Sequence, residues 1–189
     1  MINNAASVNF DDPLLDALNI NYFGCMRLLD ICKQAKKVQC FTHVSTAYVN
    51  SNRNGYIDEK VYDLENGKDP ELLIEEILKL NPQQVIEREK EIIGKYPNTY
   101  TFTKSLTERV LKKRAGSQRI AIIRPSIVIS AYEEPMVGWT ETLSAMGGLL
   151  FAGMLGLIKF LYSNDSMCLD IVPVDYCANL ILCTTSYCA

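Results

Sequence analysis

At positions 38–46 the chain reads Val38-Gln39-Cys40-Phe41-Thr42-His43-Val44-Ser45-Thr46, a short, mostly apolar run that ends in two hydroxyl side chains. A run of this kind predicts a buried strand with a polar tip. Ser45 and Thr46 would then stand at the carboxyl end of the strand, where open α/β sheets place their ligand contacts. A turn or a helix cap is the alternative explanation for these two residues.

The segments around this strand alternate between helical and strand patterns. Asp12-Pro13 predicts a helix start, with a capping carboxylate and a proline in the first turn. Apolar residues then recur at roughly helical spacing: Leu14, Leu15, Leu18, Tyr22, Met26 and Leu29. The charged, turn-rich segment 51–95 has helical character from Glu71 to Glu91.

A second helix is predicted from Tyr100 to Lys113, with Leu106 and Val110 facing inward. The β-branched run 120–123 predicts a strand, and 169–174 predicts another, with Asp175 as the cap of a final apolar helix. Strands separated by helices favour a parallel sheet covered on both faces. The predicted fold class is therefore α/β.

Composition excludes several classes of protein. The 189 residues suit one domain, 48% of them are apolar, and the net charge of −3 comes with both signs interspersed, which argues against a nucleic-acid surface. The seven cysteines form no CxxC pair, and no secretory signal is visible, so we expect reduced, mostly buried thiols in the cytosol. His43 is most simply a strand residue, and no metal site is predicted.

The segment from Leu143 to Tyr162 is nearly continuous apolar sequence and is long enough to span a bilayer. Its four glycines, Ser144 and Lys159, together with the lack of flanking basic clusters, favour a buried helix or one that lines an apolar pocket. A membrane span is the alternative.

Tyr100 and Lys104 are the residues most suggestive of chemistry. Four residues apart on a helix, the phenol and the ammonium project from one face. A nearby cation favours the phenolate, so the tyrosine would exchange a proton with a carbonyl oxygen more readily near neutral pH. Lys104 could instead pair with Glu108 on a solvated face, and Asn21 could simply bond to backbone within a core helix.

Taken together, these residues resemble a known arrangement, that of the extended short-chain dehydrogenases/reductases. The motifs occur in the family's order: Asn4-Ala5-Ala6, Asn21, Ser45-Thr46, Tyr100-x-x-x-Lys104 and Arg124-Pro125. More narrowly, the chain resembles the alcohol-forming fatty acyl-CoA reductases. The phrases that carry this match are Phe41-Thr42-His43-Val44-Ser45-Thr46-Ala47-Tyr48-Val49-Asn50, Pro97 to Lys104, Arg124-Pro125-Ser126-Ile127-Val128, Gly138-Trp139 and Asp170-Ile171-Val172-Pro173-Val174-Asp175.

The resemblance implies a role for each matched residue. Tyr100 would be the general acid, with Lys104 lowering its pKa and binding the nicotinamide ribose. Thr46, beside Ser45, would hold the substrate oxygen, and Asn21 would support the proton relay. The cofactor would pack against Ala5, Ala6 and the stretch Pro125, Ser126 and Ile127.

The implied reaction takes a long-chain acyl-CoA through an aldehyde to a primary alcohol, with NADPH used twice. The apolar segment at about 136–166 would lie beside the acyl chain, whose burial gains about 0.8 kcal/mol per methylene. The resemblance also implies peripheral membrane association at the cytosolic face of the endoplasmic reticulum or peroxisome, and no secretion.

The chain departs from the family at its start. It contains no glycine-rich G-x-x-G-x-x-G turn, so the residues that separate NAD from NADP are missing with that turn. We therefore expect residues 1–189 to be the C-terminal portion of a reductase domain: a partial Rossmann-like, doubly wound parallel sheet that lacks the first strands, with an insertion at about 51–95. This interpretation makes the chain a fragment or an incomplete gene model.

Four alternatives stay open at this point. A nucleotide-sugar epimerase or dehydratase would share Thr46, Tyr100 and Lys104, and a thioester reductase domain would share the hydride chemistry. A cysteine-dependent acylating dehydrogenase would need a thiolate nucleophile, for which no cysteine has a recognisable setting. The last alternative is a non-catalytic, truncated remnant.

Overall fold

The structure is a computed structural model that describes residues 1–142, 146–160, 162, 164, 166 and 168–189. The chain forms two compact units. Unit 1 comprises Met1–Arg124 together with Thr185–Ala189, and unit 2 comprises Pro125–Thr184. The sequence pattern indicated a single domain with an insertion and gave no sign of this division.

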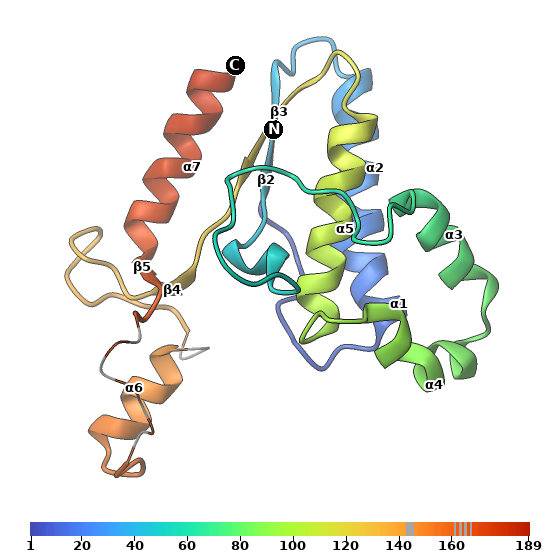
Figure 1. The fold of residues 1–189 in the computed structure, drawn as a ribbon. Helices are drawn as coiled ribbons and strands as arrows, with labels where there is room; N and C mark the ends of the chain where they lie inside the picture. Colours follow the sequence, from blue (N-terminus) through green and yellow to red (C-terminus); the bar gives the residue numbers. More distant parts are fainter. Residues whose placement is uncertain (143–145, 161, 163, 165, 167) are drawn as a thin grey trace. The chain divides into compact units, whose positions relative to one another are not determined.

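Unit 1 is built on a parallel sheet of three strands in the order β1 (Ile2–Asn3), β2 (Cys40–Val44) and β3 (Arg119–Ile123) (Figure 1). β2 is central, with Thr42 opposite Ile2 on one side and Ala121 on the other. The buried strand expected from the run 38–44 is thereby confirmed, and so is the parallel sheet. Cys40, Phe41, Thr42 and His43 of this central strand are buried, as expected for a strand in the interior of a parallel sheet.

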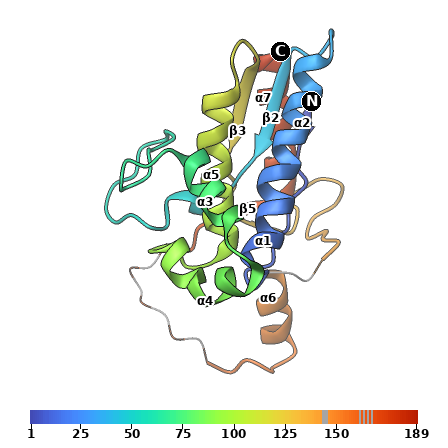
Figure 2. The same ribbon diagram turned by 90° about the vertical axis from the view of Figure 1, so that its right-hand side faces the viewer.

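Two long helical segments cover one face of this sheet (Figure 2). The first runs through α1 (Leu14–Ala17), a π-helical stretch η1 (Leu18–Phe23) and α2 (Gly24–Gln34), and the second is α5 (Thr99–Arg114). A short 3₁₀ helix, η2 (Ala47–Asn50), follows β2. The amide of Asn98 caps α5 by accepting from Thr101 N–H at 2.9 Å.

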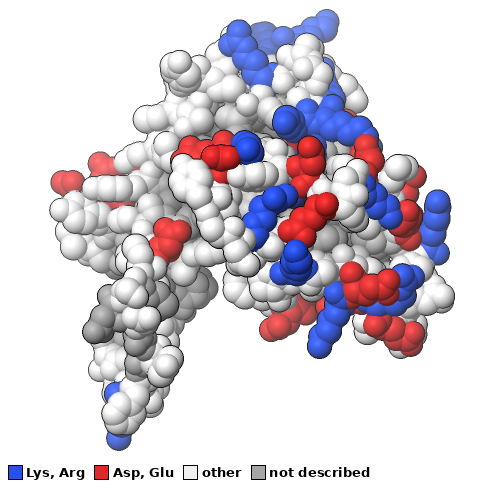
Figure 3. Space-filling view, viewed as in Figure 1, with Lys and Arg blue, Asp and Glu red and all other residues white. Residues whose placement is uncertain are grey.

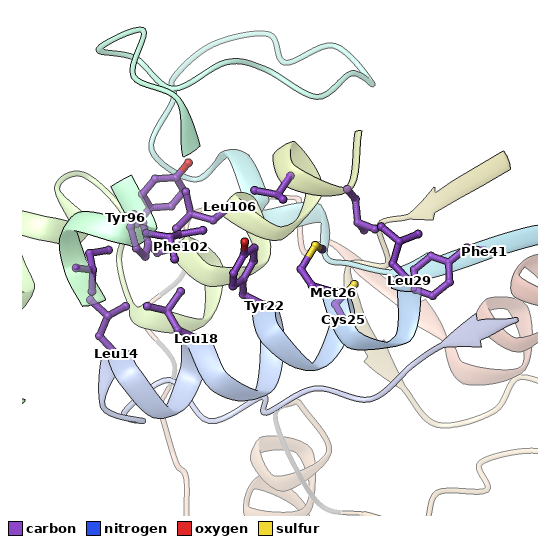
Figure 4. Packing of buried hydrophobic residues seen from close by; sticks show 14 of the residues in the cluster. Leu14, Leu18, Tyr22, Cys25, Met26, Leu29, Phe41, Tyr96, Phe102 and Leu106 are labelled. Atoms are coloured by element: carbon purple, nitrogen blue, oxygen red, sulfur yellow. The ribbon is translucent and has the colours of Figure 1, made fainter. Parts of the chain in front are cut away.

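The core of unit 1 lies between these helices. Figure 4 shows Leu14, Leu18 and Tyr22 of the first segment facing Tyr96, Phe102 and Leu106. Leu106 and Val110 are fully buried, as the helical spacing predicted. Burying side chains of this size contributes roughly 1.5–3 kcal/mol each, which holds α5 in a fixed position on the sheet.

The insertion contains a loop followed by α3 (Pro70–Lys79) and α4 (Pro82–Ile93). Asp69 caps α3, while Asn81 and Gln84 form a reciprocal capping box at the start of α4. Each helix begins with a proline, which explains why the expected helical stretch 71–91 divides into two. Lys and Arg alternate with Asp and Glu over the right-hand part of the face shown in Figure 3.

The prediction that Asp12 caps the first helix is wrong. The residue at the N-cap of α1 is Pro13, which makes no side-chain capping bond, and the Leu14 N–H donates to the distant Glu89 carboxylate at 3.3 Å. The Asp12 carboxylate accepts from Ser7 Oγ and from Asn9 Nδ2, the latter at 2.7 Å. It thus organises the loop that precedes the helix.

Unit 2 contains a second parallel pair, β4 (Ile127–Ile129) and β5 (Ile171–Pro173), together with α6 (Met146–Met154) and most of α7 (Val174–Cys188). The predicted cap at Asp175 is also wrong, because this residue lies inside the first turn of α7. Its carboxylate accepts the backbone N–H groups of Tyr132, Glu133 and Glu134. Burial would raise the pKa of this carboxyl, but these bonds lower it to about 2.

The apolar segment expected at 143–162 is described only in part, since residues 143–145 and 161 lie outside the described residues. Its described part forms α6, followed by exposed apolar side chains: Leu155, Leu157 and Phe160. Among the described helices, none has the length and apolar character needed to cross a bilayer.

Candidate active site

The carboxyl ends of three parallel strands meet at one edge of the unit 1 sheet. β1 leads there into Asn4-Ala5-Ala6, β2 into Ser45-Thr46, and β3 into Arg124. Ser45 N–H donates to Ile123 O at 2.7 Å, which extends the pairing of β2 and β3 to this edge. Such an edge is where open α/β sheets bind ligands.

Tyr100 lies in the first turn of α5, beside the end of β2. Its phenol lies near the side chain of Thr46, which acts on its pKa, and Thr46 Oγ1 accepts from Tyr48 N–H at 3.3 Å. Burial raises the pKa of Tyr100, and Thr46 opposes that rise only in part. From the sequence we expected Lys104 to lower the pKa of Tyr100, whereas in the structure that pKa is raised. The phenol therefore stays protonated at neutral pH, which is the form that a proton donor needs.

Lys104 lies one turn further along α5 and is only 3% exposed. Its ammonium donates to Val44 O at 2.8 Å, at the end of β2 and next to Ser45. Burial lowers the pKa of Lys104 to about 8, although its interactions with Cys25 and Glu108 act to raise it. The solvated Lys104–Glu108 pair considered from the sequence is not formed, because Glu108 is buried and binds Arg124.

Asn21 joins the site from the π-helical stretch η1 and is 2% exposed. Its side-chain oxygen accepts from Ser7 N–H at 2.9 Å, and its amide nitrogen donates to Thr103 Oγ1 at 3.1 Å. Its backbone oxygen accepts from Thr107 Oγ1 at 3.2 Å. The side chain of Asn21 therefore bonds to other segments and not to the backbone of its own helix, which was the alternative. Short π-helical stretches such as η1 are frequent at functional sites.

The structure also places residues at the site that the sequence did not single out. The exposed ring of Phe10 packs against Tyr100, with ring centroids 5.6 Å apart. Its loop is held by Asp12, whose backbone oxygen accepts from Thr99 Oγ1 at 2.8 Å. A lone aromatic residue in a polar loop was the available signal, but such a residue is common at protein surfaces.

Two features fit a bound ligand at this edge. Ser45 Oγ is buried and has no hydrogen-bond partner among the described residues, although buried hydroxyls normally have one. Ala5 is exposed and Ala6 half-buried, with side chains small enough to let a flat group approach the backbone. Ser45, Thr46, Lys104 and this Ala5-Ala6 turn are thus suited to hold a nicotinamide cofactor.

The other predicted cofactor residues, Pro125, Ser126 and Ile127, begin unit 2, where they are half-buried and lead into β4. The structure brings together Tyr100, Thr46, Lys104 and Asn21 within unit 1. Among the described residues, no cluster of His, Cys, Asp and Glu is arranged to hold a metal ion.

His43 lies in the middle of β2 and is 1% exposed. Its Nδ1 contacts Asn3 Nδ2 at 3.2 Å and Cys25 Sγ at 3.6 Å, and its Nε2 has no partner among the described residues. Burial and the charge of Lys104 lower the pKa of His43 to about 3, so the ring is neutral. All seven cysteines are free thiols, and four of them are buried.

Comparison with known proteins adds a family to this geometry. Residues 1–181 match the model of a family of NAD-binding domains described as male sterility protein. Fatty acyl-CoA reductase 1 of Xenopus laevis is 37% identical over 97% of the chain, and fatty acyl-CoA reductase 2 of Bos taurus is 36% identical over 98%. The chain spans 35% of the length of each of these relatives.

Two solved structures share the fold. The terminal R domain from the myxalamid PKS-NRPS biosynthetic pathway superposes with a TM-score of 0.60 and 16% identity, over 97% of this chain and 39% of that one. UDP-glucuronic acid 4-epimerase from Bacillus cereus, in complex with NAD, gives a TM-score of 0.62 and 16% identity, over 98% and 48%. These likenesses establish a Rossmann-type α/β fold, as the sequence predicted.

Proposed function

The chain belongs to the male sterility family of NAD-binding domains, which is the family of the fatty acyl-CoA reductases, and on this premise we propose that the protein reduces long-chain fatty acyl-CoA. The proposed cofactor is NADPH, and the proposed product is a primary alcohol formed through an aldehyde. The observation that carries this proposal is the position of Tyr100 near Thr46 at the carboxyl edge of the sheet, with Lys104 one turn away and bonded to Val44 O.

Two neighbouring hydroxyl groups can hold one carbonyl oxygen between them. In this proposal, the thioester or aldehyde oxygen accepts hydrogen bonds from Thr46 and Tyr100. Tyr100 then gives its proton to that oxygen as the carbonyl carbon is reduced. Tyr100 is protonated before the reaction, and because burial raises its pKa, the transfer relies on Lys104 to stabilise the phenolate.

Lys104 and Asn21 assist this proton transfer. When the phenol has given up its proton, the Lys104 ammonium stabilises the phenolate through its charge. Asn21 fixes the helix that carries both residues, since it bonds to Thr103 on α5 and to Ser7 in the loop after β1. A nicotinamide cofactor, when bound, supplies the hydride.

The apolar part of unit 2 supports a long acyl chain as the substrate. The described residues that follow α6 are mostly apolar and exposed, which is unusual for a soluble surface unless it binds something. We infer from the acyl-CoA substrate that the protein associates peripherally with a membrane, at the cytosolic face of the endoplasmic reticulum or peroxisome.

The proposal is tested with the purified protein, palmitoyl-CoA and either NADPH or NADH, with products separated by gas chromatography. We expect hexadecanol, with NADPH oxidised twice per acyl-CoA and NADH used poorly. Release of hexadecanal alone would correct the product and leave the substrate class intact. A folded protein that binds NADPH but leaves palmitoyl-CoA unreduced would refute the proposal.

A further inference from the structure

Glu108, one turn beyond Lys104 on α5, forms an ion pair with the half-buried Arg124. Glu108 is 2% exposed, and both of its carboxylate oxygens accept from the guanidinium of Arg124, at 3.0 Å from Nε and 2.5 Å from Nη2. Arg124 also donates to Lys60 O at 2.9 Å. A bidentate ion pair of this kind is among the strongest interactions that a carboxylate makes, and it fixes the orientation of both groups.

The ion pair with Arg124 matters for the site because Glu108 is close to Lys104 in the sequence. Glu108 lies four residues after Lys104 on α5, and a carboxylate four residues from a lysine on a helix is an ordinary partner for it. In the structure the Lys104 ammonium donates instead to Val44 O, at the end of β2. The carboxylate that could neutralise Lys104 is therefore bound to Arg124.

The other titratable groups around Lys104 are neutral. Cys25 approaches from α2, and burial raises the pKa of its thiol to about 11. His43 approaches from β2 with a pKa lowered to about 3, and Tyr100 on the same helix has a raised pKa. Among the described residues, Glu108 is thus the carboxylate that acts on Lys104.

We propose that Arg124 is a positioning residue for the proposed site: by holding the Glu108 carboxylate, it keeps that carboxylate away from the Lys104 ammonium and leaves Lys104 directed at the end of β2. This inference deepens the proposed function and rests on it for the use made of Lys104. In the Arg124-Pro125 motif, Arg124 is the last residue of this part of unit 1, and its proposed role is to hold Glu108.

Removal of Arg124 leaves a buried carboxylate without a partner, which is strongly unfavourable. We then expect Glu108 to turn to the Lys104 ammonium, which its charge already reaches one turn away on α5. The ammonium gains a negative neighbour, its protonated form is stabilised, and its pKa rises. The same change draws Lys104 away from Val44 O.

The test is a pH titration of Lys104 in the chain itself, followed by NMR with lysine labelled at Cε and assigned by loss of the signal in Lys104→Met. It needs neither substrate nor cofactor, so its outcome does not depend on whether the protein reduces acyl-CoA. The variants are Arg124→Met, Arg124→Lys, Glu108→Gln and the double variant Arg124→Met/Glu108→Gln.

We expect Arg124→Met to move the Lys104 midpoint upward by one pH unit or more from its value near 8. The double variant should return the midpoint to the unsubstituted value, and Arg124→Lys should stay close to it because a cation still holds Glu108. An unchanged midpoint in folded Arg124→Met, or a double variant as high as the single one, overturns the proposal.

Glu108→Gln decides the matter if Arg124→Met does not fold. Because Arg124 already holds the carboxylate, Glu108 has only a small effect on Lys104, and loss of the carboxylate should lower the Lys104 midpoint by less than one pH unit. A fall of one unit or more would show that Glu108 pairs with Lys104 in the unsubstituted protein, which contradicts the proposal.

Discussion

Asn21 and Thr103 join the π-helical stretch to the helix that carries Tyr100 and Lys104. Asn21 Nδ2 donates to Thr103 Oγ1 at 3.1 Å, and Thr103 Oγ1 donates in turn to Tyr100 O at 3.1 Å. Because both side chains are buried, neither can replace its partner with water. This contact therefore determines where α5 lies relative to η1.

The first prediction concerns Thr103. Thr103→Val keeps the shape of the side chain but leaves the buried Asn21 amide without its acceptor, which we expect to cost about 1–3 kcal/mol of unfolding free energy. Urea unfolding followed by circular dichroism measures the loss. Thr103→Ser keeps the hydroxyl and should lose much less; equal losses in the two variants would show that the methyl group, and not the hydrogen bond, matters.

A second prediction addresses the contact between Thr46 and Tyr100. Thr46 acts to lower the pKa of Tyr100, so Thr46→Val should raise that pKa further. The midpoint is measured from the ultraviolet absorbance of the phenolate, with Tyr100→Phe subtracted to isolate the signal. Thr46→Ser serves as the control and should titrate like the unsubstituted protein. A midpoint in Thr46→Val that stays the same or falls would contradict the contact.

Stability should depend on pH through His43, which is the single histidine of the chain. Its pKa is about 3 in the folded chain, against 6.5 for an unperturbed histidine, so between these values the unfolded chain binds a proton that the folded chain excludes. The free energy of unfolding therefore rises with pH through this window and is lost as the pH falls, by at most about 1.4 kcal/mol per pH unit.

The measurement for His43 is urea unfolding at pH 6.5 and pH 4.5, compared between the unsubstituted protein and His43→Gln. The variant should lose less stability between the two pH values, because glutamine does not titrate. An imidazole NMR signal that titrates near pH 6.5 in the folded protein would rule out this account.

The apolar segment of unit 2 gives a prediction about substrate length. Leu150 and Leu157 are 56% and 74% exposed, and replacing both with Asp should weaken long-chain substrates far more than short ones. If the segment contacts the acyl chain, each contacted methylene contributes about 0.8 kcal/mol, or roughly fourfold in kcat/KM. We would compare palmitoyl-CoA with octanoyl-CoA; an equal loss for the two substrates would remove this segment from the acyl site.

Much of unit 1 could be predicted from the sequence because its signals are local. The apolar run before Ser45 and the apolar spacing at Leu106 and Val110 each indicated an element, and both were confirmed. The roles given to Asp12 and Asp175 were wrong for a common reason. A carboxylate next to a helix start has several N–H and O–H groups within reach. Which of these groups it binds depends on how the neighbouring loops fold, and here both carboxylates bind loop donors.

The site was predicted less completely than the fold. The sequence placed Tyr100 and Lys104 on one helix. It could not show that burial raises the pKa of Tyr100 or that Arg124 forms an ion pair with Glu108. Both effects depend on residues far apart in the sequence. Phe10 was missed for the same reason, since its contact with Tyr100 arises only when the loop after β1 folds over α5.

The central claim is that Tyr100 donates the proton to the reduced carbonyl. It is tested most directly by single-turnover kinetics of Tyr100→Phe with palmitoyl-CoA and NADPH, alongside NADPH affinity measured by fluorescence. We predict that the rate falls by about 10²–10⁴-fold while the NADPH dissociation constant changes little. A Tyr100→Phe protein that binds NADPH and reduces palmitoyl-CoA within a few-fold of the unsubstituted rate would contradict the claim.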